Sequence, residues 1–196
     1  MESNRVSKVT CLGRKIYTTF PQSDKLKQVQ VDFMNLDALL KENDLDLQHD
    51  IAICTLGTTR ADAGSDEAFR LVDYTYVANF AQFALKHCGV THFHLLTSMG
   101  SDKNSWFLYP RTKGQIEAFV SDLGFKHTSI YRPGLLDRGS DARTVEKIAS
   151  FVASALSVDV LGKKIVANAL SSWAKPVTGT TILESSHISQ LIFPEL

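Results

Sequence analysis

The chain has 196 residues, 44% hydrophobic and 21% charged, so it is long enough for one domain with its own core. Its 21 basic and 21 acidic residues cancel to a formal net charge of zero, which argues against direct binding of nucleic acid. No apolar run reaches the ~20 residues of a membrane span, and no secretory signal is visible at the start. Three cysteines without metal-ligand spacing indicate reduced thiols in a cytoplasmic or nuclear compartment.

Short apolar strands alternate with longer amphipathic segments along the first part of the chain. Residues 51–56 are a continuous apolar run, which suits a strand buried on both faces. Alternation of strands and helices at this spacing predicts right-handed βαβ units and a parallel sheet. The predicted strands are residues 9–12, 29–33, 51–56, 92–96 and 128–131, and the predicted helices are residues 65–87 and 106–123.

The pattern changes after Leu136, where residues 144–156 and 163–173 are typical of helices and residues 185–192 of a short last helix. No long linker divides the chain. We therefore expect a single domain over residues 1–196, with a sheet core at 1–135 and a small helical cap at 136–196.

Tyr109 and Lys113 stand four residues apart on one predicted helix, so the lysine ammonium is expected near the phenol. A phenol is a poor base at neutral pH, and a neighbouring cation favours its phenolate form. The pair is a candidate general acid/base for an alcohol oxygen. Ser98, at the carboxyl end of the preceding strand, is a candidate hydrogen-bond donor to the same oxygen. The alternative is a packing role for Tyr109 and a solvated surface position for Lys113.

Three further segments are candidates for cofactor binding. In dinucleotide folds the end of the second strand reads the ribose, and basic residues there accept a 2′-phosphate. Arg14-Lys15 after the first predicted strand therefore favour NADP(H), although they could be two surface cations. Asp32-Phe33 would lie near adenine, and Leu56-Gly57-Thr58 would run along the cofactor. A helix-capping role for Asp32 and a turn role for Gly57 are equally open.

Other polar residues carry weaker signals. His92 and His94 lie on one face of a predicted strand, but no third ligand has suitable spacing, so we interpret them as structural or surface residues and expect no metal. Asp73 either forms a hydrogen bond near the site or faces solvent on its helix.

The order Ser98, Tyr109 and Lys113, followed by Tyr131-Arg132-Pro133-Gly134, resembles the catalytic layout of short-chain dehydrogenases. From about Val6 to Leu191 the chain is similar to the Tat-interactive oxidoreductase family, an atypical branch of that group. The segments that carry the similarity are Lys8 to Lys15, Cys54 to Arg60, Leu95 to Lys103, Phe107-Leu108-Tyr109 and Lys113-Gly114.

The resemblance implies a Rossmann-like doubly wound parallel sheet and oxidation or reduction of a small alcohol or carbonyl with NADP(H). It implies that Tyr109 is the proton acceptor with Lys113 as its partner. The family's links to apoptosis, nuclear import and transcription imply protein partners, so a non-catalytic regulatory or binding module is the alternative function. Cofactor contacts are implied for Arg14, Lys15, Leu56 and Gly57, and on the C-terminal side for Arg132, Pro133, Leu136 and Arg143.

The glycine-rich turn that holds the pyrophosphate in dinucleotide folds is missing, because no G-x-G occurs in the chain. The ribose-reading position follows that turn by about 20 residues, so the turn is expected before Met1. We therefore expect a shortened fold that lacks the first strand, the glycine-rich turn and the first helix, with impaired cofactor binding. The missing strand would be central, which would leave the strands near Val9 and Ile51 each without one partner. A shortened gene product and an incomplete sequence are both compatible with this pattern.

Overall fold

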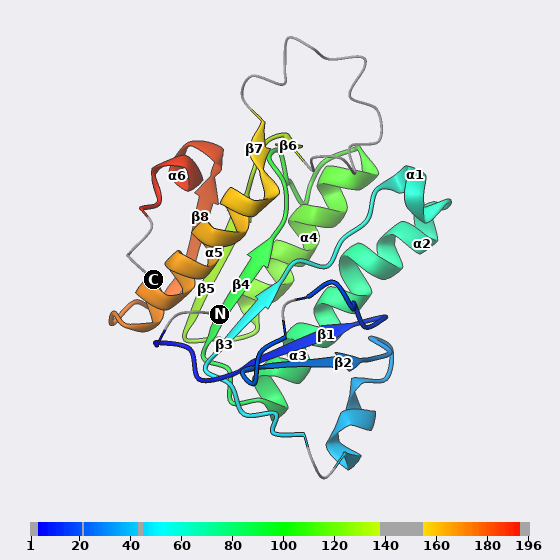
Figure 1. Ribbon diagram of the computed structural model, residues 1–196. Helices are drawn as coiled ribbons and strands as arrows, with labels where there is room; N and C mark the ends of the chain where they lie inside the picture. The colour runs from blue at the N-terminus through cyan, green and yellow to red at the C-terminus, as the bar shows by residue number, and fades with distance from the viewer. Residues whose placement is uncertain (1–3, 21, 43–44, 138–154, 193–196) are drawn as a thin grey trace.

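The computed structural model describes residues 4–20, 22–42, 45–137 and 155–192. Parallel strands with helices packed on both faces form an α/β architecture, as Figure 1 shows. In chain order the elements are β1 (Val9–Gly13), β2 (Leu26–Gln30), η1 (Leu36–Lys41), β3 (Ile51–Cys54), α1 (Arg60–Ala63), α2 (Asp66–Arg70), η2 (Leu71–Tyr76), α3 (Val77–His87), β4 (His92–Leu96), α4 (Leu108–Asp122), β5 (His127–Arg132), β6 (Leu136–Asp137), β7 (Leu156–Ser157), α5 (Val158–Trp173), β8 (Gly179–Glu184) and α6 (Ser185–Gln190).

The main sheet has the strand order β3-β4-β5-β8, and each neighbouring pair is parallel. Helices α3 and α4 cover one face, and α5 crosses the other (Figure 1). The Rossmann-like parallel α/β fold predicted from the alternating strands and helices is confirmed. Active sites of such sheets lie outside the carboxyl ends of the strands, which directs attention to the loops that follow β3, β4 and β5.

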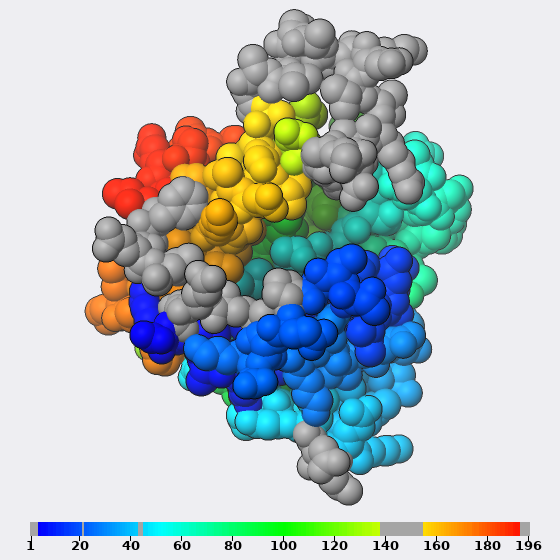
Figure 2. Space-filling view, in the orientation of Figure 1, coloured from blue at the N-terminus to red at the C-terminus, as the bar shows by residue number. Residues whose placement is uncertain are grey.

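Strands β1 and β2 form a separate parallel pair in front of the main sheet. Within the described residues no ladder joins β1 to β3, although the Nε2 atom of His49 lies 3.0 Å from the Thr10 hydroxyl. A groove of about 480 Å³ runs between β1 and β3, and its lining includes residues of α3 and α5 and of the segments that precede both strands. Figure 2 shows a recess between α5 and the blue N-terminal strands. Among the described residues no strand lies between β1 and β3.

Several predicted boundaries need correction. The strand predicted at residues 29–33 lies earlier, at Leu26–Gln30, because the Asp32 carboxylate accepts the Met34 amide and turns the chain. The helix predicted at 65–87 is present but contains the π-helical turn Leu71–Tyr76. Leu156, predicted to end a helix, belongs to β7, and the rest of that predicted helix lies outside the described residues up to residue 154.

Strand β8 was not predicted, although it completes one edge of the main sheet. Its burial is low over Gly179–Ile182 and rises only at its last two residues, so it lacks the alternation expected of a half-buried strand. The β-branched content of Thr180-Thr181-Ile182 is the signal that could have identified it.

Three buried histidines lie side by side under α5. His92, His94 and His127 are at most 4% exposed, and the rings of His92 and His127 are 5.7 Å apart. The Nδ1 atom of His94 lies 2.9 Å from the Tyr131 hydroxyl, which also accepts a hydrogen bond from Asn168 of α5. Within the described residues no group of side chains could hold a metal ion. The structural interpretation of His92 and His94 fits these positions.

Burial lowers the pKa of all three imidazoles, to about 3 for His94, because a charged ring loses its hydration there. Unfolded histidine titrates near pH ~6.5, so below that pH the unfolded chain binds more protons than the folded chain. The free energy of unfolding should therefore be fully retained above pH ~6.5. It should fall on acidification by up to about 1.4 kcal/mol per pH unit for each histidine.

Urea unfolding between pH 7.5 and 5 tests the predicted loss of stability on acidification. Most carboxylates are still ionised in this range. The variant His94→Gln should show a shallower dependence on pH than the wild type. A free energy of unfolding that stays constant across this range would contradict the prediction.

Candidate active site

The loop after β4 is fixed at the carboxyl edge of the main sheet. The Thr97 amide donates to the Tyr131 carbonyl at 2.8 Å, and the Met99 amide donates to the Pro133 carbonyl at 2.9 Å. The Asp102 amide donates to the Pro110 carbonyl in the first turn of α4, at 3.0 Å. The end of β4, the end of β5 and the start of α4 therefore form one site.

Ser98 lies within this loop. Its carbonyl accepts the Ser101 hydroxyl at 2.7 Å, which closes a turn over the residue. Its own hydroxyl oxygen is buried and has no hydrogen-bond partner among the described residues. Buried hydroxyls are normally paired, so the unpaired oxygen of Ser98 is unusual. Because it has no exposed surface, a substrate or cofactor atom would reach it only if the loop opened.

Tyr109 sits in the first turn of α4 and is 40% exposed. Its ring stacks on the buried Phe69, with centroids 5.5 Å apart and an interplanar angle of 28°. The Lys113 ammonium is 6.0 Å from the centre of the same ring. The helical spacing thus brings the phenol and the ammonium together, and the ring is held while its surface remains open.

Lys113 is buried, which differs from the solvated position considered as an alternative for it. Its ammonium lies 2.7 Å from a carboxylate oxygen of Asp73, a residue with no exposed surface. The other oxygen of Asp73 accepts the Thr58 amide at 2.8 Å. A side-chain carbon at Gly57 would lie 3.3 Å from the Lys113 ammonium. The loop after β3 therefore lies directly on the lysine.

Arg132 forms ion pairs within the protein, and its contact with a cofactor stays a prediction. Its guanidinium binds both oxygens of Glu117 and also one oxygen of Glu184. The hydrogen bonds that Arg132 donates to the Glu117 carboxylate are the main reason that the pKa of Arg132 is raised. Glu117 also accepts the Thr97 hydroxyl at 2.6 Å. This network joins α4, β5 and β8 beneath the site.

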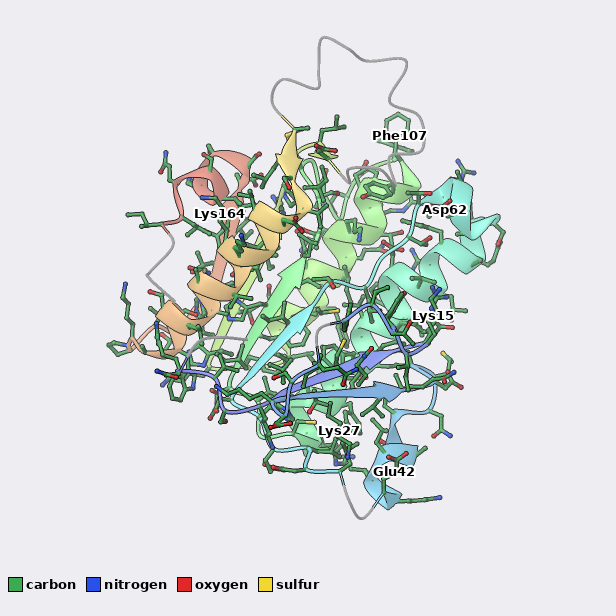
Figure 3. All side chains as sticks on the ribbon, viewed as in Figure 1. Lys15, Lys27, Glu42, Asp62, Phe107 and Lys164 are labelled. Atoms are coloured by element: carbon green, nitrogen blue, oxygen red, sulfur yellow. The ribbon has the colours of Figure 1, made fainter. Side chains whose placement is uncertain are left out.

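The N-terminal cofactor candidates lie apart from Tyr109 along the chain. Arg14 and Lys15 are exposed just beyond β1, and the Lys15 ammonium is 5.1 Å from the centre of the Tyr17 ring. Figure 3 shows Lys15 beside that end of β1. Asp32 is exposed, whereas Phe33 is 2% exposed and stacks on Tyr76 in the core. Phe33 is thus a packing residue with little surface to offer a ligand.

The remaining candidates follow β3 or β5 along the chain. Pro133 is buried and Leu56 is half-buried. Leu136 lies in β6, pairs with Leu156 of β7 and packs against the cluster around Tyr131. Arg143 lies outside the described residues.

Two residues that organise the site were not assigned a role from the sequence. Glu117 follows Lys113 by four residues on α4, so helical spacing could have placed it on the same face. Asp73 was left open between the site and solvent, because an isolated acid on a helix is usually exposed.

No family model matches the chain. Over 134 residues, covering 68% of this chain and 53% of the relative, it is 43% identical to the protein HTATIP2 of Rattus norvegicus. The chain is a homologue of HTATIP2. It is also 36% identical over 135 residues to the mitochondrial protein FMP52 of Candida albicans, covering 68% of this chain and 58% of that protein. The resemblance to the Tat-interactive oxidoreductase family is thereby confirmed, and the chain spans about half the length of the curated relatives it matches.

Two solved structures share the fold of this chain. The Bordetella bronchiseptica enzyme WbmF in complex with NAD⁺ aligns with a TM-score of 0.64 at 9% identity, covering 94% of this chain and 69% of that one. The UDP-N-acetylglucosamine 4-epimerase of Bacillus cereus aligns with a TM-score of 0.59 at 16% identity, covering 88% and 68%. At these identities the comparison shows a shared fold alone.

Proposed function

We propose that the chain is an NADP(H)-dependent reductase-like protein that acts on a small carbonyl or alcohol. The observation that carries the proposal is the open phenol of Tyr109 beside a buried, fixed ammonium at the carboxyl edge of the sheet. The relatedness to HTATIP2 and the NAD⁺ complex of WbmF support a nucleotide cofactor.

The residues present fit the nicotinamide end of such a cofactor. The hydroxyl of Ser98 lacks a hydrogen-bond partner, and Gly57 brings backbone without a side chain up to the Lys113 ammonium. A reduced nicotinamide, when bound, supplies a hydride to the substrate carbonyl carbon. In this site Tyr109 would give a proton to the carbonyl oxygen, Ser98 would hold that oxygen by a hydrogen bond, and Lys113 would stabilise the phenolate left behind.

The pyrophosphate end lacks its usual support, since the sequence has no G-x-G turn. We therefore propose that NADP(H) binds more weakly than in a complete dinucleotide fold. Titration of the purified chain with NADPH, followed by nucleotide fluorescence, tests this. A dissociation constant in the micromolar range supports the reductase, and no response up to millimolar nucleotide rejects it for this chain.

The preference for NADPH over NADH is proposed to come from Arg14 and Lys15. A charge-assisted hydrogen bond to the 2′-phosphate contributes about 1.5–3 kcal/mol, so Arg14→Ala should weaken NADPH binding at least ~10-fold. NADH binding should change less than ~2-fold, because NADH has no 2′-phosphate. Lys27→Ala, which removes an exposed cation on β2, is the matched control (Figure 3). Equal losses for both nucleotides would contradict the assignment.

The groove between β1 and β3 supports a second candidate function, a protein-binding module. Two strand edges border an apolar groove, and exposed side chains of Ile53, Val166 and Trp173 contribute to it. An extended apolar segment of a partner could pair with such edges by main-chain hydrogen bonds. Fluorescence anisotropy with labelled valine-rich and isoleucine-rich peptides tests this function. Binding that is lost in Ile53→Lys supports it, and absence of binding rejects it.

The cellular roles also remain proposals. Protein partners linked to apoptosis, nuclear import or transcription follow from the resemblance, and so does a location in the cytoplasm and nucleus. The fungal relatives are named mitochondrial, which does not clearly fit that location. In the described residues no helix combines the length and apolarity that crossing a bilayer requires. Fractionation of cells that express the tagged chain decides the compartment.

A further inference from the structure

We propose that Asp73 is a positioning residue that fixes the Lys113 ammonium and couples it to the loop Leu56-Gly57-Thr58. For its catalytic consequence the proposal depends on the reductase function above. The contact itself can be tested without any activity.

Asp73 lies in the π-helical turn Leu71–Tyr76, between α2 and α3. A π-helical turn re-aims side chains relative to a regular helix and is frequent at functional sites. The carboxylate has no exposed surface, although it is an acid on a helix of the outer layer. A charge in such a position requires a compensating partner.

Both oxygens of Asp73 have a partner. One lies 2.7 Å from the Lys113 ammonium. This contact is an ion pair, and its geometry is not that of a hydrogen bond. The other accepts the Thr58 amide at 2.8 Å. One buried carboxylate thus touches the catalytic helix α4 and the loop after β3, and each charge neutralises the other.

Gly57, in the loop proposed to contact the cofactor, lies against the ion pair of Asp73 and Lys113. A side-chain carbon there would lie 3.3 Å from the ammonium, a tight contact, and 3.4 Å from the carboxylate, an ordinary van der Waals distance. The backbone of the loop therefore packs on the ion pair. A nucleotide that orders this loop would also order Lys113, and through Lys113 the surroundings of Tyr109.

The first test is chemical labelling of Lys113 with an amine-reactive reagent, quantified by mass spectrometry. The wild type should label slowly, and Asp73→Asn should label at least threefold faster because the ammonium loses its counter-charge. Asp66→Asn, which removes the partner of Arg60 on the surface, is the matched control and should not change Lys113 labelling. Unchanged labelling of Lys113 in Asp73→Asn would overturn the proposal.

If Asp73→Asn alone does not fold, the double variant Asp73→Ala with Lys113→Met removes both charges of the pair. Amide hydrogen exchange of the segment that contains Thr58 is then compared with Lys113→Met alone. Exchange should be at least tenfold faster in the double variant, because the acceptor of the Thr58 amide is gone. Equal exchange would show that Asp73 does not hold the loop.

Kinetics separate this proposal from the reductase function. With an active wild type, Asp73→Asn should lower kcat at least tenfold and change KM for the carbonyl less than threefold, and the pH profile of the rate should also change. A proportional loss across all pH values, following only the folded fraction, would mark Asp73 as structural and reject positioning. If the wild type shows neither NADPH binding nor turnover while the labelling result holds, the reductase function fails and the Asp73 contact stands.

Discussion

Replacing Tyr109 with phenylalanine is expected to reduce carbonyl reduction with NADPH by a factor of about 10² to 10⁴. In the proposed reaction the substitution removes the phenol that would give a proton to the nascent alkoxide. It keeps the ring, and therefore the stacking on Phe69 at 5.5 Å. Within the described residues the phenol oxygen forms no hydrogen bond, so the melting temperature should change by less than about 2 °C. The measurement is NADPH oxidation with a panel of aldehydes and quinones, beside a thermal melt.

Tyr74→Phe is the control for this prediction. Tyr74 packs on Phe119 with ring centroids 6.0 Å apart, so its replacement also deletes a phenol oxygen while leaving an aromatic contact. Its activity should match the wild type. A large fall in melting temperature for Tyr109→Phe, or activity equal to that of Tyr74→Phe, would identify Tyr109 as a packing residue.

The fold could be predicted because runs of neighbouring residues in the sequence identify its buried strands. The run from Ile51 to Leu56 is apolar in sequence, and the segment His92–Leu96 is buried on both faces. Each is followed by a helix that ends near a glycine. These are properties of neighbouring residues, which a sequence displays directly. Strand β8 has no such pattern, because it is an edge strand whose stability comes from pairing with β5.

Only the part of the site that depends on spacing within one helix could be predicted from the sequence. Tyr109 and Lys113 are four residues apart, and the structure places them together as that spacing requires. The partner of Lys113 is forty positions away along the chain, and the ion pair exists because a π-helical turn carries Asp73 inward. No pattern of neighbouring residues in the sequence indicates the contact between Asp73 and Lys113.

The same limit explains Arg132 and Phe33. The sequence placed Arg132 at the end of a strand, where a free cation could meet a cofactor. In the structure it is bound by Glu117 from α4 and Glu184 from β8. Phe33 follows a strand, as expected, but its ring turns into the core against Tyr76. Position along the strand was predictable in both cases, and the tertiary partner was not.

Among the described glycines, Gly114 is the one at which an added methyl group is expected to lower the stability most. A side-chain carbon there would lie 2.1 Å from the Lys103 amide nitrogen and 2.4 Å from the Asp102 carbonyl carbon. Both atoms belong to backbone, so they cannot rotate away as the end of a side chain could. The loop that carries Ser98 packs on α4 at this point, and the Asp102 amide bonds the Pro110 carbonyl there.

We therefore expect Gly114→Ala to destabilise the fold by about 3 kcal/mol or more, which corresponds to a fall in melting temperature of roughly 6–12 °C. Gly162→Ala is the matched control, because Gly162 is also helical but has nothing within 4 Å of the added carbon. Helix propensity alone should make that variant more stable by about 0.5–1 kcal/mol. Because both variants gain the same helical propensity, the difference between their melting temperatures measures the contact between the Ser98 loop and α4. Equal stabilisation of the two variants would mean that the loop that carries Ser98 does not rest on α4.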